Sequence, residues 1–346
     1  MVGSLSLTLI QLKKKTKATI MACKKQALLI LFLSLFTFST SHPDNGGIAV
    51  YWGQDSREGD LKSTCDSGKY AIVVLGFLSK FGAGRTPVLN FAGHCGNGSW
   101  KKCTELEFQI KHCQAKGIRV LLSIGGASSE YSLISAADAK TVANYLFSNF
   151  LSGQYGPLGA VTLDGIDFSI ENSENHWDVL AAELDSLRRS RGPYFFLSGA
   201  VHCSSPAPFP TDLFEYIFVK FFNNPTCAYS NANANANATP LLNSWDYWVN
   251  SVLSNNSLFL GLPATSSAVT GYIPSHVLKH DILPHVKKAS NYEGVVLWDR
   301  HTDNQNGYSA SILFHVLKTP LISVTSVSDA IYQCVSKVMN RAYADH

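Results

Sequence analysis

Short apolar segments recur along the chain and alternate with amphipathic ones. Eight of them have the length and composition of buried β-strands. They span residues 48–52, 70–78, 119–124, 163–171, 194–201, 216–222, 258–262 and 293–298. Between most of them, apolar residues recur at helical spacing, in residues 105–115, 138–150, 177–189, 241–253, 276–288 and 309–317.

This order of elements predicts an α/β fold, a single (β/α)8 TIM barrel, in which eight parallel strands close into a cylinder covered by helices. A doubly wound open sheet is the alternative. However, Gly125-Gly126-Ala127-Ser128, after the third predicted strand, lacks the glycine spacing of a dinucleotide-binding fingerprint. We therefore favour the barrel.

The fourth predicted strand, residues 163–171, carries a row of acidic side chains. Successive side chains of a strand point to opposite faces, so Asp167, Ser169 and Glu171 share one face and apolar residues occupy the other. Two carboxylates on a buried strand are costly. A solvated edge strand would also explain them, but the apolar flanks favour a buried strand and hence catalytic acids inside a barrel.

Catalytic residues of such barrels lie at the carboxyl ends of the strands. Glu171, Phe222 and Trp298 end the fourth, sixth and eighth predicted strands. We expect these three residues to converge on one cleft.

The composition fits one globular domain. The chain has 346 residues, of which 46% are hydrophobic and 15% charged, and a single barrel of this size is common. The net charge is only +3, and runs of Lys and Arg are confined to the N-terminus. Nothing therefore argues for nucleic acid as a partner.

The N-terminal region has the pattern of a secretory leader. After Met21, Lys24 and Lys25 precede an apolar run (residues 27–38) and small residues (39–41), the order of regions in a signal peptide. The run is short for a membrane span, which disfavours a retained anchor. We expect residues 1–45 to be an upstream extension plus signal peptide, 46–317 the barrel, and 318–346 a C-terminal extension.

The cysteines fit an oxidising compartment. Cys23 lies in the predicted leader and Cys334 in the C-terminal extension, which leaves six: Cys65, Cys95, Cys103, Cys113, Cys203 and Cys227. An even set in a secreted chain predicts three disulfides, whose pairing the spacing leaves open. Zinc is a poor alternative because no C-x-x-C pair occurs. The N-x-S/T sequons at Asn97, Asn237 and Asn255 are candidate glycosylation sites.

Two weaker patterns favour plain interpretations. His276, His280 and His285 fit a solvated helix better than a metal site, so we expect neither metal nor cofactor. The Asn-Ala repeat of residues 231–238 is of low complexity and is most simply a mobile loop after the sixth strand.

Several motifs together resemble those of a known family. Residues 164–171, D-G-I-D-F-S-I-E, are similar to the D-G-x-D-x-D-x-E signature of family 18 glycoside hydrolases, and segments 47–54, 90–95, 123–126 and 222–225 extend the match. The set resembles plant class III chitinases. Within that group, residues 177–180 and 292–300 look most like the branch of xylanase-inhibitor proteins.

The resemblance implies a (β/α)8 barrel with disulfides Cys65–Cys113, Cys95–Cys103 and Cys203–Cys227. It implies substrate contacts from Tyr51, Gln54, Phe77, Gly126 and Trp298. In active relatives it also implies a substrate-assisted reaction. There, the last glutamate of the signature protonates the leaving oxygen, the middle aspartate holds the acetamido N–H, and a tyrosine donates to the acetamido oxygen.

The chain keeps part of this pattern. Glu171 and Asp167 stand where the acid and a supporting aspartate belong, whereas Ser169, Lys220 and Phe222 replace the usual aspartate, glutamine and tyrosine. Loss of one preorganised charge costs about 10²- to 10³-fold in rate, and phenylalanine donates no hydrogen bond. An inward-facing Lys220 would favour an ionised Glu171 without a proton to donate. A Lys220 that turns to solvent is the alternative.

We therefore expect a secreted, chitinase-like plant defence protein with weak or absent hydrolysis. It would act by binding a chitin-type glycan or by inhibiting a microbial xylanase or another glycosidase. An active endochitinase and a storage protein are the alternatives, so enzymatic activity stays open. We expect a monomer in the apoplast, with the vacuole as an alternative, and no membrane contact after signal cleavage.

Overall fold

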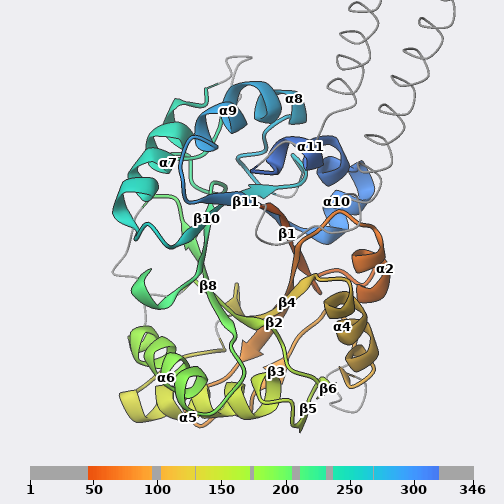
Figure 1. Cartoon of the computed structure of the whole chain (residues 1–346), viewed down its shortest axis with the longest axis vertical. Helices are drawn as coiled ribbons and strands as arrows, with labels where there is room; N and C mark the ends of the chain where they lie inside the picture. The colour runs from red at the N-terminus through yellow and green to blue at the C-terminus, as the bar shows by residue number, and fades with distance from the viewer. Residues whose placement is uncertain are drawn as a thin grey trace, which may run out of the picture. The chain divides into compact units, whose positions relative to one another are not determined.

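A closed barrel of parallel strands forms the centre of the described part of the chain (Figure 1). The computed structural model describes residues 46–95, 103–128, 130–171, 175–204, 211–230, 237–267 and 269–318. The barrel strands are β1 (Gly47–Trp52), β2 (Ile72–Lys80), β4 (Arg119–Gly126), β7 (Gly165–Ile170), β8 (Phe196–His202), β9 (Tyr216–Lys220), β10 (Ser257–Pro263) and β11 (Tyr292–Trp298). Each pairs in parallel with the next, and β11 pairs with β1 to close the barrel.

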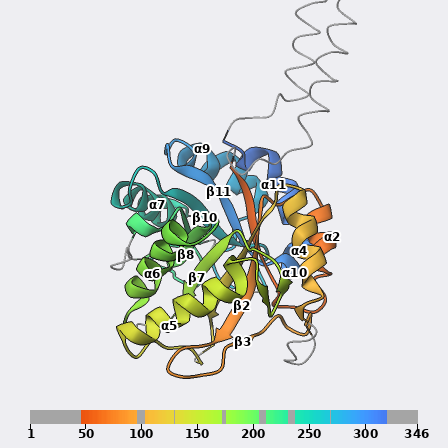
Figure 2. The same ribbon diagram turned by 60° about the horizontal axis from the view of Figure 1, so that its bottom comes forward.

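Helices cover the outside of the barrel (Figures 1 and 2). They are α2 (Leu61–Asp66), α4 (Leu106–Ala115), α5 (Ala136–Leu146), α6 (Trp177–Ser190), α7 (Thr239–Ser251), α8 (Ser275–Val277), α9 (Leu283–Val286), α10 (Arg300–Asn306) and α11 (Tyr308–Val316). Smaller elements are β3 (Val88–Leu89), antiparallel to β2, the hairpin β5 (Tyr155–Gly156) and β6 (Gly159–Ala160), the π-helical turns Phe147–Leu151 and Leu278–Ile282, and the 3₁₀ turn Thr211–Leu213.

The predicted barrel is confirmed. All eight predicted strands are present, with ends within two residues of those expected. The sixth is shorter than expected, because β9 ends at Lys220 and Phe222 lies in the loop that follows. The predicted helix over 276–288 is divided into α8, a π-helical turn and α9, with Pro284 at the start of α9.

The helices α2 and α10 were not predicted. Each is too short to show a helical repeat of apolar residues, and local capping defines it instead. The side chain of Asp60 accepts the N–H of Ser63 at the start of α2. Asp299 and Thr302 form a reciprocal capping box on α10, and Gly307 is the C-cap that follows it.

Alternating residues of each strand pack into two separate layers. On β1, Ile48, Val50 and Trp52 belong to the large cluster between barrel and helices, whereas Ala49 and Tyr51 belong to a smaller cluster inside the barrel. Both faces of each strand are therefore buried, which explains why the strands read as continuous apolar runs rather than as alternating ones.

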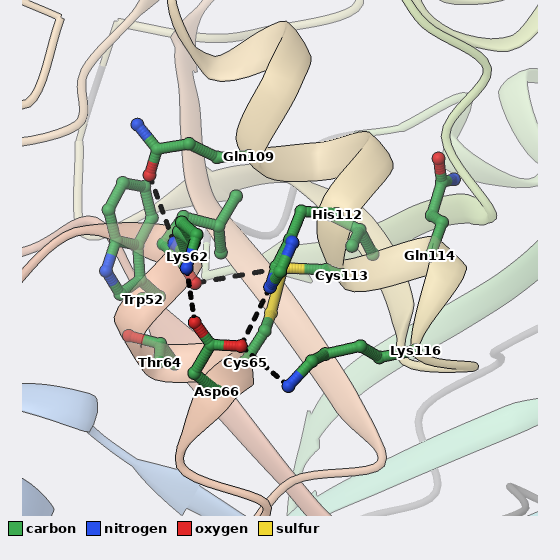
Figure 3. The surroundings of a disulfide bond; sticks show 12 residues. Trp52, Lys62, Thr64, Cys65, Asp66, Gln109, His112, Cys113, Gln114 and Lys116 are labelled. Carbon is green, nitrogen blue, oxygen red and sulfur yellow. Dashed lines mark hydrogen bonds and ion pairs between the residues drawn. A yellow bond between two sulfur atoms is a disulfide. The ribbon is translucent and has the colours of Figure 1, made fainter.

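The three disulfides have the pairing that the family resemblance implies: Cys65–Cys113, Cys95–Cys103 and Cys203–Cys227. The first joins α2 to α4, and Figure 3 shows its surroundings. Beside it, the carboxylate of Asp66 contacts Lys62 at 2.6 Å, Lys116 at 2.6 Å and His112 at 2.8 Å. Covalent and ionic contacts thus hold the same helix pair.

Several sequence predictions fall outside the described residues. These are the leader (1–45), the C-terminal extension beyond Lys318 with Cys334, the sequon at Asn97 and most of the Asn-Ala repeat. Asn237 and Asn255 are exposed, as glycosylation would require. Within the described ranges, no helix combines the length and apolar character needed to cross a membrane.

The cluster around Asp66 yields a pH-dependent test. Hydrogen bonds from Lys116, Lys62 and His112 hold the pKa of the Asp66 carboxyl well below its usual range. A carboxyl whose pKa is lower in the folded state stabilises the fold above its unfolded pKa of about 4, and this contribution disappears as the pH falls. We expect Asp66→Asn to lower the thermal midpoint at pH 7 in low salt. The deficit should shrink below about pH 4 and in about 1 M salt.

Thermal melts of both proteins from pH 7 to pH 2 measure this difference. Asp281→Asn is the matched control, since Asp281 is an exposed aspartate without such a cluster of cations. An Asp66→Asn midpoint equal to that of the parent protein in low salt at pH 7 would show that the cluster contributes no stability.

Candidate active site

A cleft of about 200 Å³ lies at the carboxyl ends of the barrel strands. Its walls come from β1, β2, β4, β7, β9 and β11 and from the loops that follow them. The lining residues are Tyr51, Phe77, Gly126, Ala127, Ser169, Glu171, Phe218, Lys220, Phe222, Asn223, Val269, Val296 and Trp298. The expected convergence of Glu171, Phe222 and Trp298 is therefore present.

Asp167 lies beneath this cleft and is fully buried. Its Oδ2 accepts hydrogen bonds from Tyr51 (2.9 Å) and Ser123 (2.6 Å), and its Oδ1 accepts one from Ser198 (2.7 Å). Burial raises the pKa of Asp167, whereas the three hydroxyl donors and the charge of Lys220 oppose that rise. Both carboxyl oxygens are thus satisfied inside the barrel.

Strand register creates this network. Ser123 on β4 and Ser198 on β8 both stand opposite Asp167 on β7, so three neighbouring strands place Ser, Asp and Ser in one row. The sequence pattern did not single out either serine. A polar residue at an inward position of an apolar strand was the one hint in the sequence. It identifies a partner of Asp167 only once the strand register is known.

Three aromatic rings form one wall of the cleft. The ring centroids of Tyr51 and Trp298 are 5.4 Å apart, and Phe77 lies 6.1 Å from each of them. The Tyr51 hydroxyl is committed to Asp167, and its pKa is raised by burial and then by that carboxyl. The wall therefore offers flat apolar surface of the kind that lines ligand sites.

Gly126 is required beneath this wall. It has a φ of +78°, and a Cβ at this position would lie 2.9 Å from the ring of Phe77. The carbonyl of Gly126 accepts the hydroxyl of Tyr131 at 2.9 Å, and that hydroxyl accepts the backbone N–H of Glu171 at 3.0 Å. Gly126 thus contacts the aromatic wall and, through Tyr131, the end of β7.

The Lys220 side chain points inward and pairs with Glu171. Its Nζ lies 3.1 Å from Glu171 Oε1. The Lys220 side chain is 8% exposed and that of Glu171 is 41% exposed, so the carboxylate is the outer partner. This geometry confirms the inward orientation and excludes the alternative in which the lysine turns to solvent.

Ser169 and Phe222 also occupy the expected places. Ser169 is buried in the cleft floor between Asp167 and Glu171 on the same strand. Phe222 lines the cleft beyond β9. Neither side chain brings a charge, and Phe222 brings no polar group.

Two residues have positions that the sequence did not indicate. Gln54 does not line this cleft, and its amide instead donates to the carbonyls of Gly53 (2.9 Å), Gly76 (2.5 Å) and Asn90 (3.3 Å). His202 on β8 stands opposite Lys220. Burial, followed by the charge of Lys220, lowers the pKa of His202, so its ring is neutral near pH 7.

The described histidines and acids form no group of three that could hold a metal ion. His276 and His280 are exposed, and His285 pairs with Asp246 at 2.8 Å.

A TIM barrel with a carboxylate at the end of its fourth strand and an aromatic wall beside it fits a glycoside-hydrolase type of site. Residues 47–274 match the sequence pattern of the glycosyl hydrolases family 18. The chain belongs to this family, as its motifs indicated.

Known relatives include both enzymes and binding proteins. An acidic endochitinase of Vitis vinifera is 48% identical over 296 residues, which cover 82% of this chain and 96% of the relative. A xylanase-α-amylase inhibitor protein solved with trehalose is 41% identical, with a TM-score of 0.71 over 78% of this chain and 98% of the other. A tamarind chitinase-like lectin is 37% identical, with a TM-score of 0.67 over 77% and 98%.

The contact between Gly126 and Phe77 can be tested with two alanine substitutions. Gly84→Ala introduces a side chain at a φ of +72° with nothing within 4 Å, so it should cost only the backbone strain of about 1–2 kcal/mol. Gly126→Ala should cost about 1–3 kcal/mol more, because its Cβ overlaps the Phe77 ring. Urea unfolding of both variants measures the difference, and equal losses would show that Phe77 moves aside freely.

Proposed function

We propose that this protein is a secreted chitinase-like protein that binds an oligosaccharide in its cleft and hydrolyses it weakly or not at all. The observation that carries this proposal is the ion pair between Lys220 and Glu171, 3.1 Å long, at the position of the family's proton donor.

The ion pair places a cation directly on the carboxyl group that would have to serve as the general acid. A general acid must carry a proton when the glycosidic oxygen leaves. Protonation of Glu171 would leave the buried ammonium of Lys220 without its partner, which is costly. The buried carboxylate of Asp167 already receives three hydroxyl groups. In this geometry Glu171 Oε1 accepts a hydrogen bond from Lys220 Nζ, which opposes its use as a proton donor.

The residues around the ion pair provide little stabilisation for a cationic reaction intermediate. Ser169 is neutral and Phe222 is apolar. Catalysis depends on preorganised groups that stabilise charge as it develops, and each missing group costs about 10²- to 10³-fold. The same cleft still offers an aromatic wall and several hydrogen-bonding groups, which suits binding.

The space available suits a ligand longer than one sugar ring. A second hollow of about 460 Å³ adjoins the cleft, with Val269 in the walls of both. Tyr229, Tyr272, Pro225 and Pro274 contribute to its largely apolar lining. The relatives solved with trehalose or described as a chitinase-like lectin support a carbohydrate as the ligand. We therefore propose chitin-type oligosaccharides as the first class to test.

Two further functions have specific support. Inhibition of a microbial xylanase or another glycosidase is favoured by the relative described as a xylanase-α-amylase inhibitor. Endochitinase activity is favoured by the retained Asp167 and Glu171 and by relatives described as endochitinases. The three disulfides support an oxidising compartment, and hence secretion to the apoplast or delivery to the vacuole.

Reversion of the three departing residues tests the loss of turnover. We expect the parent protein to release little or no product from chitotetraose, and Ser169→Asp, Phe222→Tyr and Lys220→Gln to recover little activity singly. The triple variant should recover activity about 10²-fold or more beyond the best single variant, because the groups act together. Product release is measured by chromatography.

The control for this series is Glu171→Gln in the triple variant, which should abolish any recovered turnover. Hydrolysis by the parent protein at a rate typical of endochitinases would refute the proposal in favour of the enzyme. Absence of gain in a folded triple variant would show that these three positions do not account for a lack of activity.

Calorimetric titration separates the ligand classes. We expect chitotetraose to bind the parent protein, and Trp298→Ala to weaken binding about tenfold or more, because the change removes a large aromatic face from the wall. Tyr247→Ala, at an exposed aromatic on α7, is the control. Titration with a fungal xylanase tests inhibition. If the xylanase bound and chitotetraose did not, the inhibitor function would replace the proposed oligosaccharide binding.

A further inference from the structure

Glu58 is a buried carboxylate that the proposed function does not use. It lies in the loop between β1 and α2, and its side chain is fully buried. Its Oε1 accepts the backbone N–H of Gly53 at 2.7 Å and of Asp55 at 3.3 Å, and lies 3.1 Å from His94 Nε2. Its Oε2 has no hydrogen-bond partner among the described residues. Burial of a carboxyl group is costly unless hydrogen bonds compensate it, so the contacts to Oε1 are the ones that hold this side chain in place.

His94 connects this carboxylate to a second loop. Its Nε2 lies 3.1 Å from both Glu58 Oε1 and the carbonyl of Asp55. Both partners are acceptors, so this nitrogen carries the hydrogen. The ring packs on Trp52 with a centroid distance of 4.3 Å, and the next residue, Cys95, is fixed by its disulfide. Glu58 therefore joins the loop after β1 to the loop after β3.

A short series of contacts leads from this junction to the cleft. Gln54, between two residues whose N–H groups Glu58 accepts, donates its amide to Gly76 and Asn90. Asn90 and Phe77 exchange two backbone hydrogen bonds of 2.9 Å each. Phe77 forms part of the aromatic wall. The wall is thus attached to Glu58 through Gln54.

We propose that Glu58 and His94 are positioning residues that hold the Phe77 side of the cleft at the spacing needed for a sugar ring. Glu58 Oε1 accepts hydrogen bonds from two loops and so fixes the loop that carries Gln54. The Gln54 amide in turn donates to the carbonyls of Gly76 and Asn90, which lie beside Phe77. Neither residue lines the cleft, so neither contacts ligand there. Only the affinity test of this inference depends on the proposed oligosaccharide function.

The first experiment needs no ligand. It measures the hydrogen-exchange rates of the Phe77 and Asn90 backbone amides, which report how firmly the Phe77 side of the cleft is held. Glu58→Met keeps the length of the side chain but removes the acceptor, and His94→Phe keeps a ring against Trp52 but removes the donor. Each should speed exchange of these two amides about tenfold or more, while amides of β7 to β9 keep the parent rates. Glu58→Gln retains an acceptor oxygen and should stay within about threefold of the parent.

Two further variants keep the test decisive. Glu293→Met removes a buried carboxylate at the amino end of β11, away from the cleft, and should not speed exchange at Phe77 and Asn90 selectively. Gln54→Leu leaves Glu58 and His94 in place but removes the connecting amide. It should reproduce the faster exchange at Phe77 and Asn90, and it replaces Glu58→Met if that variant does not fold.

The second experiment is titration with chitotetraose. Glu58→Met, His94→Phe and Gln54→Leu should each weaken binding about tenfold or more, whereas Glu58→Gln should keep an affinity close to that of the parent protein. Faster exchange spread evenly over the barrel, or unchanged exchange at Phe77 and Asn90, would overturn the positioning role. If the parent protein bound no chitotetraose, the proposed ligand class would fail while the exchange result still decided the role of Glu58.

Discussion

Closure of the barrel between β1 and β11 is the constraint on which the rest of the structure depends. Gly47 stands opposite Gly294, and a Cβ on Gly294 would lie 2.0 Å from the carbonyl oxygen of Gly47. Only glycine permits this approach. Because the strands close in parallel, their carboxyl ends meet at one mouth, and residues far apart in the chain, such as Tyr51 and Trp298, become neighbours.

The closed barrel also determines what its interior must contain. The side chain of Asp167 on β7 cannot reach bulk water, so it needs partners from neighbouring strands. Asp167 receives hydroxyls from three different strands, and Glu171, nearer the mouth, pairs with Lys220 on β9. The two carboxylates thus differ with depth in the barrel. Asp167 lies deep and is held by neutral hydroxyl donors, whereas Glu171 lies nearer the mouth and is paired with a cation.

The fold could be predicted because its strands and most of its helices follow their own periodicity. The sequence left an inward and a solvent-facing Lys220 open, and the structure has the inward one. Ser123, Ser198 and His202 could not be identified in this way, because their roles depend on which residues stand opposite them. Glu58 and Gln54 lie in a loop, where no repeat relates sequence to position, so their roles required the structure.

The three residues that the family resemblance marks as replacements line the cleft at the mouth of the barrel. Ser169, Lys220 and Phe222 all line the cleft, while the hydroxyl network beneath them is complete. Selection could therefore alter what this site does without weakening the scaffold that carries it. A barrel with this separation of layers can change between catalyst and binder through few substitutions, which agrees with the mixture of enzymes, inhibitors and lectins among its relatives.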